Sequence, residues 1–390
     1  MRIFLSCFQS DEQYDIPPYA HWERYFKKGI EEAGYECVEA SGVDWAAGFA
    51  ATDDEARAVW RERAWSQTIA QIERFQKQGK PVDLFLGYLY PEQVEPAAIS
   101  KLQSMGVPCV NFFCDNVREF RRIPETYHCF DLHWVPEFKA LKMYEEAGLE
   151  YVHAPMPCWI SPELRTCEHP DTYGVTFIGS RDALREDLFA EALQLGAPIE
   201  LRGTGWNEEK EAREGPPSWR EKSPLQTIQN QIHFAKDQGL MAWVRRIWSR
   251  LRPERTEYDF EKAVRKRPND REYIRIVQES TITLGVNRYP SYRYPLSDLD
   301  TYSRMRDLEA PMMGACYLTE WTEGLGQRYE LGEEIETYRT AEELVEKIRA
   351  LKANPEKRKR LRCNGQKRAL TDHTVGASIK SISEHFGIRQ

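Results

Sequence analysis

The sequence predicts an α/β protein built from two Rossmann-like domains that face each other across a cleft. Short apolar runs alternate with longer amphipathic segments along most of the chain, which is the signature of βαβ units and a parallel sheet. The 390 residues are too many for one hydrophobic core and fit two domains of roughly 150 to 200 residues. The series of βαβ units restarts after the proline-containing stretch 157–172.

Residues 1–160 are predicted to form the first domain. Its strand candidates are, in order, RIFLSC, YECVEA, VDLFLGY, PCVNFFC, DLHWVP and YVHAPM. Helical patterns between them lie at about 19–34, 54–78, 92–106 and 137–148. Each pattern ends at a glycine placed as a helix C-cap, namely Gly34, Gly79, Gly106 and Gly148.

Residues 170–371 are predicted to form the second domain. Its strand candidates are YGVTFIG, PIELRGTGW, STITLGVN, ACYLT and EIETY. Residues 207–270 interrupt this series with charged, helical sequence that contains no strand candidate, so we expect a helical insertion there. A last helix within 372–390 is a candidate to cross back to the first domain.

Composition bounds the class of protein. The net charge of −8, from 54 Lys and Arg against 62 Asp and Glu, argues against a nucleic-acid binder that works through bulk positive charge. The nine cysteines make no C-x-x-C pair, so we expect reduced, buried thiols in a cytoplasmic protein. Polar sequence follows the first apolar run at once, which argues against a signal peptide, and no apolar run approaches the roughly 20 residues of a membrane span.

One segment of the insertion, 241–252, has a basic amphipathic pattern. Trp243, Ile247 and Trp248 share one helical face, and the arginines lie largely elsewhere. Such a helix can lie on anionic lipid at the inner face of a membrane. The alternative is a helix packed on its own domain, which the many acidic residues of the insertion favour.

Several local signals converge between residues 298 and 325. Apolar residues at helical spacing lead to a Gly-Ala turn at 314–315, and a short buried strand follows. Glu309 is the single carboxylate two residues before Pro311. Thr322, Glu323 and Gly324 form a loop past the strand, where open α/β sheets bind ligands, often anionic ones. An ordinary helix feeding a strand gives the same pattern.

This stretch resembles the donor-binding core of the GT-B glycosyltransferases, in the branch of the spore-maturation CgeB proteins, whose pattern is roughly R-x-F-E-A-P-A-C-G-A-x-L-L-T-E. The matching residues are Arg306, Leu308, Glu309, Ala310, Pro311, Gly314, Ala315, Leu318, Thr319 and Glu320. The resemblance continues over residues 334–374, which are similar to the family's closing strand and two helices.

The resemblance implies a transferase that takes its sugar from a nucleotide-sugar donor and requires no metal or other cofactor. Glu309 matches the second of two glutamates that lie eight positions apart in related retaining enzymes, and would accept hydrogen bonds from the ribose hydroxyls. The first position falls on Thr301, a departure that leaves the sugar contacts and the stereochemical outcome open. Asp298-Leu-Asp300 spells D-x-D, which is better explained as an acidic helix start than as a metal site.

Other residues are candidates to bind the donor. Gly179, Ser180 and Arg181 follow the first strand of the second domain at a helix start, where a diphosphate fits, with Arg185 one turn on. Gly205 and Trp206 resemble the family's turn near the nucleotide base. Arg304 or Arg306 would stabilise the departing diphosphate. A further group of polar and aromatic residues lies between a strand and the core helix, and would form the rim, or lip, of a sugar or diphosphate site. Its members are Asn287, Arg288, Tyr289, Tyr292, Arg293 and Tyr294.

The first domain would hold the acceptor. The acceptor hydroxyl would belong to a glycan, a lipid-linked molecule, a protein or a small molecule. A transferase must take a proton from that hydroxyl, and the candidate bases are Asp115, His133 and His153. Each has a plainer explanation: Asp115 as a helix cap, and the histidines as core residues. Two alternatives to a transferase stay open. One is a sugar-nucleotide epimerase or hydrolase of the same fold. The other is a non-catalytic scaffold, which the replacement of the first glutamate by Thr301 allows.

Overall fold

The computed structural model describes residues 1–10, 12, 19–50, 54–206, 244, 258–289 and 300–388. The chain divides into two units. The first contains Met1–Trp159 and His373–Gln390, and the second contains Ile160–Asp372. The basic amphipathic segment 241–252, apart from Val244, and most of the predicted insertion 207–270 lie outside the described residues.

The first unit is built on a six-stranded parallel sheet with the order β2-β1-β3-β4-β5-β6. Its strands are β1 (Arg2–Ser6), β2 (Glu36–Glu39), β3 (Leu84–Gly87), β4 (Cys109–Phe112), β5 (Leu132–Val135) and β6 (Tyr151–His153). Each lies inside one of the six predicted apolar runs. The three strands β3, β4 and β5 are buried along their whole length, as expected of a parallel sheet covered on both faces.

Helices connect these strands as the amphipathic pattern predicts. They are α1 (Tyr19–Glu32), α2 (Ala47–Ala50), α3 (Asp54–Lys77), α4 (Pro96–Ser104), α5 (Asn116–Glu119) and α6 (Leu141–Glu146). The four glycines predicted to cap helices adopt φ between 67° and 83°, the left-handed region that a glycine C-cap requires.

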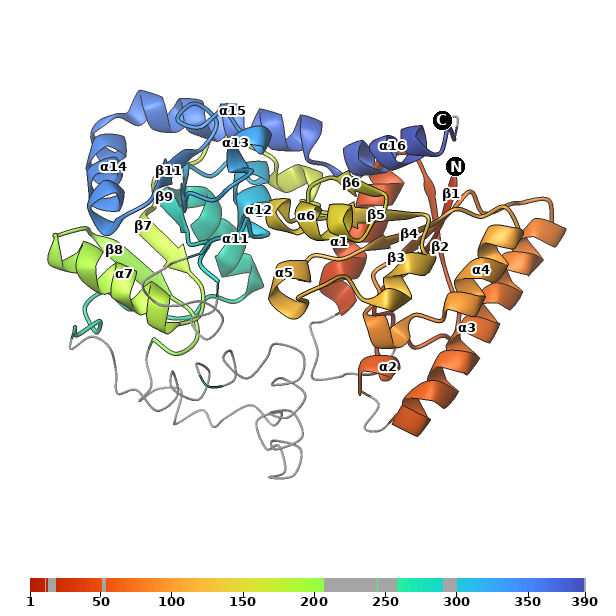
Figure 1. Cartoon of the computed structure of the whole chain (residues 1–390). Helices are drawn as coiled ribbons and strands as arrows, with labels where there is room; N and C mark the ends of the chain where they lie inside the picture. The colour runs from red at the N-terminus through yellow and green to blue at the C-terminus, as the bar shows by residue number, and fades with distance from the viewer. Residues whose placement is uncertain are drawn as a thin grey trace. The chain divides into compact units, whose positions relative to one another are not determined.

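The last helix of the chain, α16 (Val375–His385), belongs to the first unit and packs against α1. Glycine makes this approach possible, because a Cβ atom at Gly29 would lie 2.5 Å from Cγ2 of Val375. Figure 1 shows the two helices, from opposite ends of the chain, side by side. The chain therefore returns to its first unit after completing the second.

The second unit is built on a five-stranded parallel sheet with the order β11-β10-β9-β7-β8. Its strands are β7 (Tyr173–Ile178), β8 (Ile199–Arg202), β9 (Ser280–Gly285), β10 (Tyr317–Glu320) and β11 (Glu336–Tyr338). Its helices include α7 (Ala183–Gln194), α11 (Asp270–Glu279), α12 (Arg306–Met312), α13 (Leu325–Arg328), α14 (Ala341–Ala353) and α15 (Pro355–Asp372). No helix among the described residues of either unit is long and apolar enough to cross a membrane.

One prediction from the cysteine pattern is wrong for two of the nine residues. Cys167 and Cys363 form a disulfide, with their Cα atoms 5.0 Å apart and a sequence separation of 196. The pair meets because the segment before β7 lies on α15, a long-range contact that local spacing does not reveal. The other seven cysteines are free thiols.

Candidate functional site

The carboxyl ends of the parallel strands form one edge of the second sheet, called the carboxyl edge here, and a ligand site is expected at this edge. The strand order reverses at β7, because β8 lies on one side of it and β9 on the other. Open α/β sheets bind ligands outside the carboxyl ends of their strands at such a switch point. The residues that follow these strands include Gly179 after β7 and Asn287 after β9. Most of the predicted donor residues therefore lie at this edge.

A tight glycine corner joins the ends of β7 and β8. The amide of Gly179 donates to the carbonyl of Arg202 at 2.8 Å, and the indole Nε1 of Trp206 donates to the carbonyl of Gly179 at 2.8 Å. Gly203 has φ of 138°, and a Cβ atom there would lie 2.2 Å from the Gly179 oxygen. The corner brings together five of the predicted donor residues: Gly179, Ser180, Arg181, Gly205 and Trp206.

Two residues of this corner support the fold rather than present themselves to a ligand. Trp206 is 5% exposed, and its ring packs against Phe189 and Phe260, so it belongs to the core instead of stacking on a base. The Nε of Arg181 donates to the carboxylate of Glu186 at 3.0 Å, which neutralises its charge. The helix start at α7 has its own carboxylate as well, because Asp182 accepts from the amide of Leu184.

Glu309 lies on α12 with its carboxylate held in one orientation. The hydroxyl of Tyr273, on α11, donates to Oε2 of Glu309 at 2.6 Å. Nε of Arg306 lies 3.8 Å from the same oxygen, and the Arg306 guanidinium covers the Tyr273 ring with 4.9 Å to the ring centre. A carboxylate offers about four lone-pair positions. An oriented Glu309 can therefore accept further hydrogen bonds, as a ribose-binding carboxylate must.

Three guanidinium groups, of Arg185, Arg304 and Arg306, lie near one another at this edge, and the Arg306 group is the one beside Glu309. Arg185, on α7, donates through Nη1 to the carbonyl and the hydroxyl of Ser180 rather than to a carboxylate. Burial, and next the nearby positive charge of Arg304, lower the pKa of Arg185 to about 10, and Arg306 acts in the same direction. A bound anion would relieve the repulsion that Arg185 experiences from these like charges.

The central residue of this edge is one that sequence reasoning missed. Asp307 is fully buried at the start of α12. Its carboxylate accepts hydrogen bonds from the backbone amide of Arg304 and the side chains of Asn287, Ser303, Tyr317 and Thr319. These bonds tie the loop that carries Arg304 to β10 and to the end of β9. The signal in the sequence was only an acidic residue one position from a matched arginine.

A buried ion pair supports the same edge. Nε of Arg288 donates to Oε1 of Glu320 at 2.7 Å, and both residues are at most 8% exposed. The other end of Arg288 donates to the carbonyl of Leu184, and Oε2 of Glu320 accepts from the amide of Asn287. Asn287 and Arg288 were predicted to form part of a ligand lip, and the structure instead buries them. The rest of that lip, apart from the buried Tyr289, lies outside the described residues.

Asp300, the one residue of the D-x-D sequence that the structure describes, does not begin a helix. Asp298 lies outside the described residues, and Asp300 accepts from the amide of Thr301 at 2.9 Å in an extended segment that pairs with Arg288. The helix starts only at Arg306. Within the described ranges, no three His, Cys, Asp or Glu side chains are grouped as metal ligands would be.

The loop after β10 is partly buried. Thr322 is fully buried, and its carbonyl accepts from the amide of Leu325. Gly324 has φ of 84° and precedes α13, and Glu323 is exposed. Of the three residues predicted to contact the nucleotide here, Thr322 is therefore the one whose side chain faces the protein interior.

The three candidate bases belong to the first unit, at β4, β5 and β6. Asp115 is half-buried at the start of α5, with Oδ1 3.6 Å from Arg118. His133 is 1% exposed between aromatic rings, and burial lowers its pKa to about 3, which argues against proton transfer to a substrate. His153 is half-buried on the edge strand, 5.9 Å from the Phe138 ring.

Sequence reasoning also missed Glu137, which follows β5 and is 3% exposed. Its Oε2 accepts from the amide of Val117, on α5. Burial raises the pKa of Glu137 to about 8, and the neighbouring charge of Asp115 adds to that rise. A glutamate two residues after an apolar strand was the available signal, although nothing local to it reveals the burial.

Comparison with known proteins agrees with this architecture. The family model described as "Glycosyl transferase-like" matches residues 184–384, slightly more than half of the chain. The chain belongs to this family. The match runs from the start of α7 to the last turn of α16, so it contains Arg185, Arg304, Arg306 and Glu309. No curated protein matches the sequence.

Comparison with solved structures shows the fold of this chain. Sucrose-phosphate synthase from Thermosynechococcus elongatus is 13% identical, with a TM-score of 0.56 over 99% of this chain and 98% of that one. HepE from Anabaena, in complex with UDP, is 11% identical, with a TM-score of 0.52 over 99% and 100%. A glycosyltransferase from Rickettsia africae is 10% identical, with a TM-score of 0.53 over 99% and 97%. The predicted GT-B fold is confirmed.

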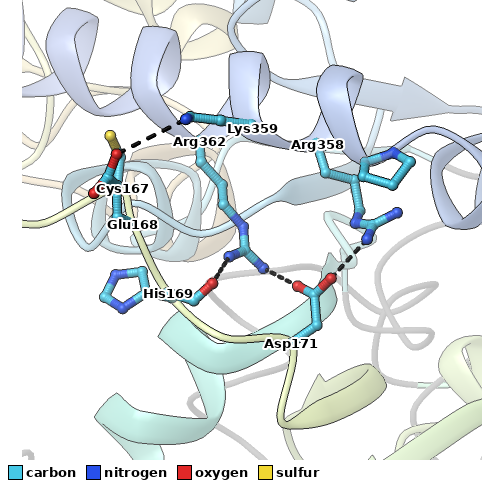
Figure 2. A pocket seen from close by; sticks show the side chains of 8 residues that line it. Cys167, Glu168, His169, Asp171, Arg358, Lys359 and Arg362 are labelled. Atoms are coloured by element: carbon cyan, nitrogen blue, oxygen red, sulfur yellow. Dashed lines mark hydrogen bonds and ion pairs between the residues drawn. The ribbon is translucent and has the colours of Figure 1, made fainter.

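A cavity of about 340 Å³ lies at the other edge of the second sheet of this glycosyl transferase-like protein. Its wall includes Asp171, just before β7, and Arg362, which donates to the carbonyl of Ser280 at the start of β9. Figure 2 shows Arg358 and Arg362 reaching from α15 to the two oxygens of Asp171, at 2.6 and 2.8 Å. None of the predicted donor residues lines this cavity.

Proposed function

We propose that this protein is a glycosyltransferase that moves a sugar from a nucleotide-sugar donor to an acceptor hydroxyl. The observation that carries the proposal is the grouping of Arg185, Arg304 and Arg306 at the sheet edge where Arg306 lies beside the oriented carboxylate of Glu309. Guanidinium groups suit a diphosphate, and a carboxylate acceptor suits the two ribose hydroxyls. The two kinds of group lie at one sheet edge, as a nucleoside diphosphate requires.

Two further facts support this assignment. The chain belongs to the glycosyl transferase-like family, and HepE, which shares its fold, is known in complex with UDP. We also propose that the protein belongs to the CgeB branch, and the match of residues 306–320 to the CgeB pattern supports this. Retention of anomeric configuration follows from the resemblance at Glu309 and is proposed on that ground.

The rate enhancement would come from orientation and electrostatics. As the bond between the sugar and the diphosphate breaks, negative charge grows on the leaving phosphate, and fixed guanidinium groups stabilise that charge without reorganisation. Arginines at this position do what a divalent metal does in other transferases, which is why we propose catalysis without a metal. The acceptor would lie against the first unit, where Asp115 is our candidate to receive its proton. A cytoplasmic location and a membrane contact through 241–252 stay predictions from the sequence.

A thermal-shift screen tests the proposal. The purified protein is heated with UDP, GDP, dTDP, CMP and their sugars, with and without EDTA. A ligand at a hundred times its dissociation constant stabilises the protein by about 2.7 kcal/mol, which raises the transition by a few degrees. A selective shift that survives EDTA supports a metal-independent donor site. No shift with any nucleotide favours a scaffold, and nucleotide turnover without an acceptor favours an epimerase or hydrolase.

A further inference from the structure

The disulfide between Cys167 and Cys363 lies on the surface of the cavity at the amino edge of the second sheet. Cys167 lines that cavity, and both cysteines are partly exposed. Five of the seven free cysteines are buried. The two partly exposed free thiols, Cys37 and Cys129, have pKa values that burial raises to about 12. Thiolate chemistry is thus suppressed at these two sites, whereas the disulfide is open to an incoming thiol.

The surroundings of the disulfide favour thiol exchange. Figure 2 shows Cys167 and His169 at one opening with charged side chains, and Lys359, which is 62% exposed, lies 3.8 Å from the carboxylate of Glu168. The three cations of the wall, Arg358, Lys359 and Arg362, outnumber its two carboxylates, Glu168 and Asp171. Positive charge near a sulfur stabilises the thiolate that leaves or attacks. Exposed disulfides in proteins with otherwise reduced thiols are the labile, regulatory ones.

The segment held by the disulfide touches the end of the helix that carries Glu309. Gly314, just after α12, has φ of 73°, and a Cβ atom there would lie 2.1 Å from the carbonyl of Thr166. Nε2 of His169 lies 2.6 Å from that same carbonyl and 3.1 Å from the carbonyl of Met313. Gln278 donates to Leu164 and to Met313 as well. The segment 164–169 thus packs against the C-terminal end of α12.

We propose that Cys167 and Cys363 form a reversible redox site whose disulfide holds the segment 164–169 against α12 and thereby sets the affinity of the donor site. The effect on the donor rests on the proposed function, and the effect on α12 does not. A dithiol reductant supplies the electrons. Its thiolate attacks Sγ of Cys167, Sγ of Cys363 leaves as a thiolate and takes a proton from water, and the second thiol of the reductant then releases Cys167 as a thiol. The protein disulfide is reduced, and the dithiol is oxidised to a cyclic disulfide.

The reduced protein stays folded, because a second anchor remains. Asp171 is held by Arg358 and Arg362, and neither ion pair involves sulfur. Reduction therefore frees the segment on one side only. We expect the transition temperature of the second unit to fall by about 5 to 10 °C, since the bond closes a loop of 196 residues. We also expect weaker binding of UDP by about threefold or more, the usual size of coupling between linked sites.

The test compares oxidised and dithiothreitol-reduced protein in three measurements. Intact mass after iodoacetamide should show two additional alkylated cysteines on reduction. Hydrogen exchange should accelerate in residues 306–314, and titration with UDP should give a weaker affinity. Cys363→Ser should behave as reduced protein under both conditions, and Cys37→Ser, a matched change at a free thiol, should keep the full response.

Each outcome decides a separate part of the proposal. Full alkylation of Cys167 in the oxidised protein would overturn the redox site. Unchanged exchange in residues 306–314 on reduction would overturn the link to α12, leaving a purely structural bond. If neither form binds UDP or another nucleotide, the proposed donor site fails, while alkylation and exchange still decide the redox site and its link to α12.

Discussion

Replacing Glu137 by glutamine should change how the stability of the first unit depends on pH. Burial, aided by Asp115, raises the pKa of Glu137 from 4.5 to about 8. Between these values the folded protein keeps a proton that the unfolded chain has lost. The contribution of Glu137 to stability is therefore largest below pH 4.5 and is lost as the pH rises through 8. Glutamine is neutral at every pH and can still accept the Val117 amide, so the variant lacks this loss.

The size of the effect follows from the two pKa values. One bound proton changes the free energy of unfolding by about 1.4 kcal/mol per pH unit. From pH 5.5 to 7.5 the wild type should lose about 2 to 3 kcal/mol more than Glu137→Gln, after allowing for partial ionisation of the folded state at the upper pH. This exceeds the effect of most surface substitutions.

The free energy of unfolding is measured in urea at pH 5.5 and 7.5. Hydrogen exchange of peptides from β4 and β5 is the signal, so that the measurement reports on the first unit alone. Glu146→Gln is the matched control, because Glu146 is exposed at the end of α6 and should respond equally at both pH values. Equal pH dependence in the wild type and Glu137→Gln would refute the claim that a protonated carboxyl is buried beside Asp115.

Three further changes probe the second unit. Glu309→Gln should weaken nucleotide binding about 10- to 100-fold in calorimetry, because a charge-assisted acceptor is lost, and an affinity equal to wild type would remove Glu309 from the site. Arg304→Met should lower nucleotide affinity and also flatten its dependence on salt, and a parallel salt dependence would show that no charge contact was removed. Gly203→Ala should destabilise the protein by about 2 kcal/mol or more in thermal unfolding, because its Cβ would meet Gly179 at φ of 138°. Gly174→Ala, whose Cβ would make only an ordinary contact with Oε1 of Glu200 at 4.0 Å, should stay near wild type, and equal Tm values for the two variants would contradict the close approach at Gly203.

The fold was readable from the sequence because local chemistry determines it. Buried parallel strands give continuous apolar runs, and glycines at the predicted C-caps adopt the left-handed conformation. Glu309 was identified by a motif, and the structure places it on α12 at the sheet edge. Arg185 was noted only as a charge one turn from Arg181, and it is Arg185 that joins the cluster, since Arg181 is paired with Glu186.

The supporting residues were not readable, because their role depends on long-range contact. Asp307 accepts from residues 20 positions before it and 12 after it. The disulfide joins residues 196 apart, and Arg288 was taken for a ligand-binding arginine when its partner is the buried Glu320. Spacing along the chain reveals periodicity and short motifs, whereas burial and pairing of a charge are decided by which distant elements pack on it.

Hydrogen exchange with and without nucleotide tests the central claim most directly. The claim is that the carboxyl edge of the second sheet binds a nucleotide-sugar donor through Arg185, Arg304, Arg306 and Glu309. The nucleotide that shifts the melting transition should slow exchange in residues 179–186 and 304–310. Protection confined to the cavity wall at 167–171, or no protection with any nucleotide, would contradict the account.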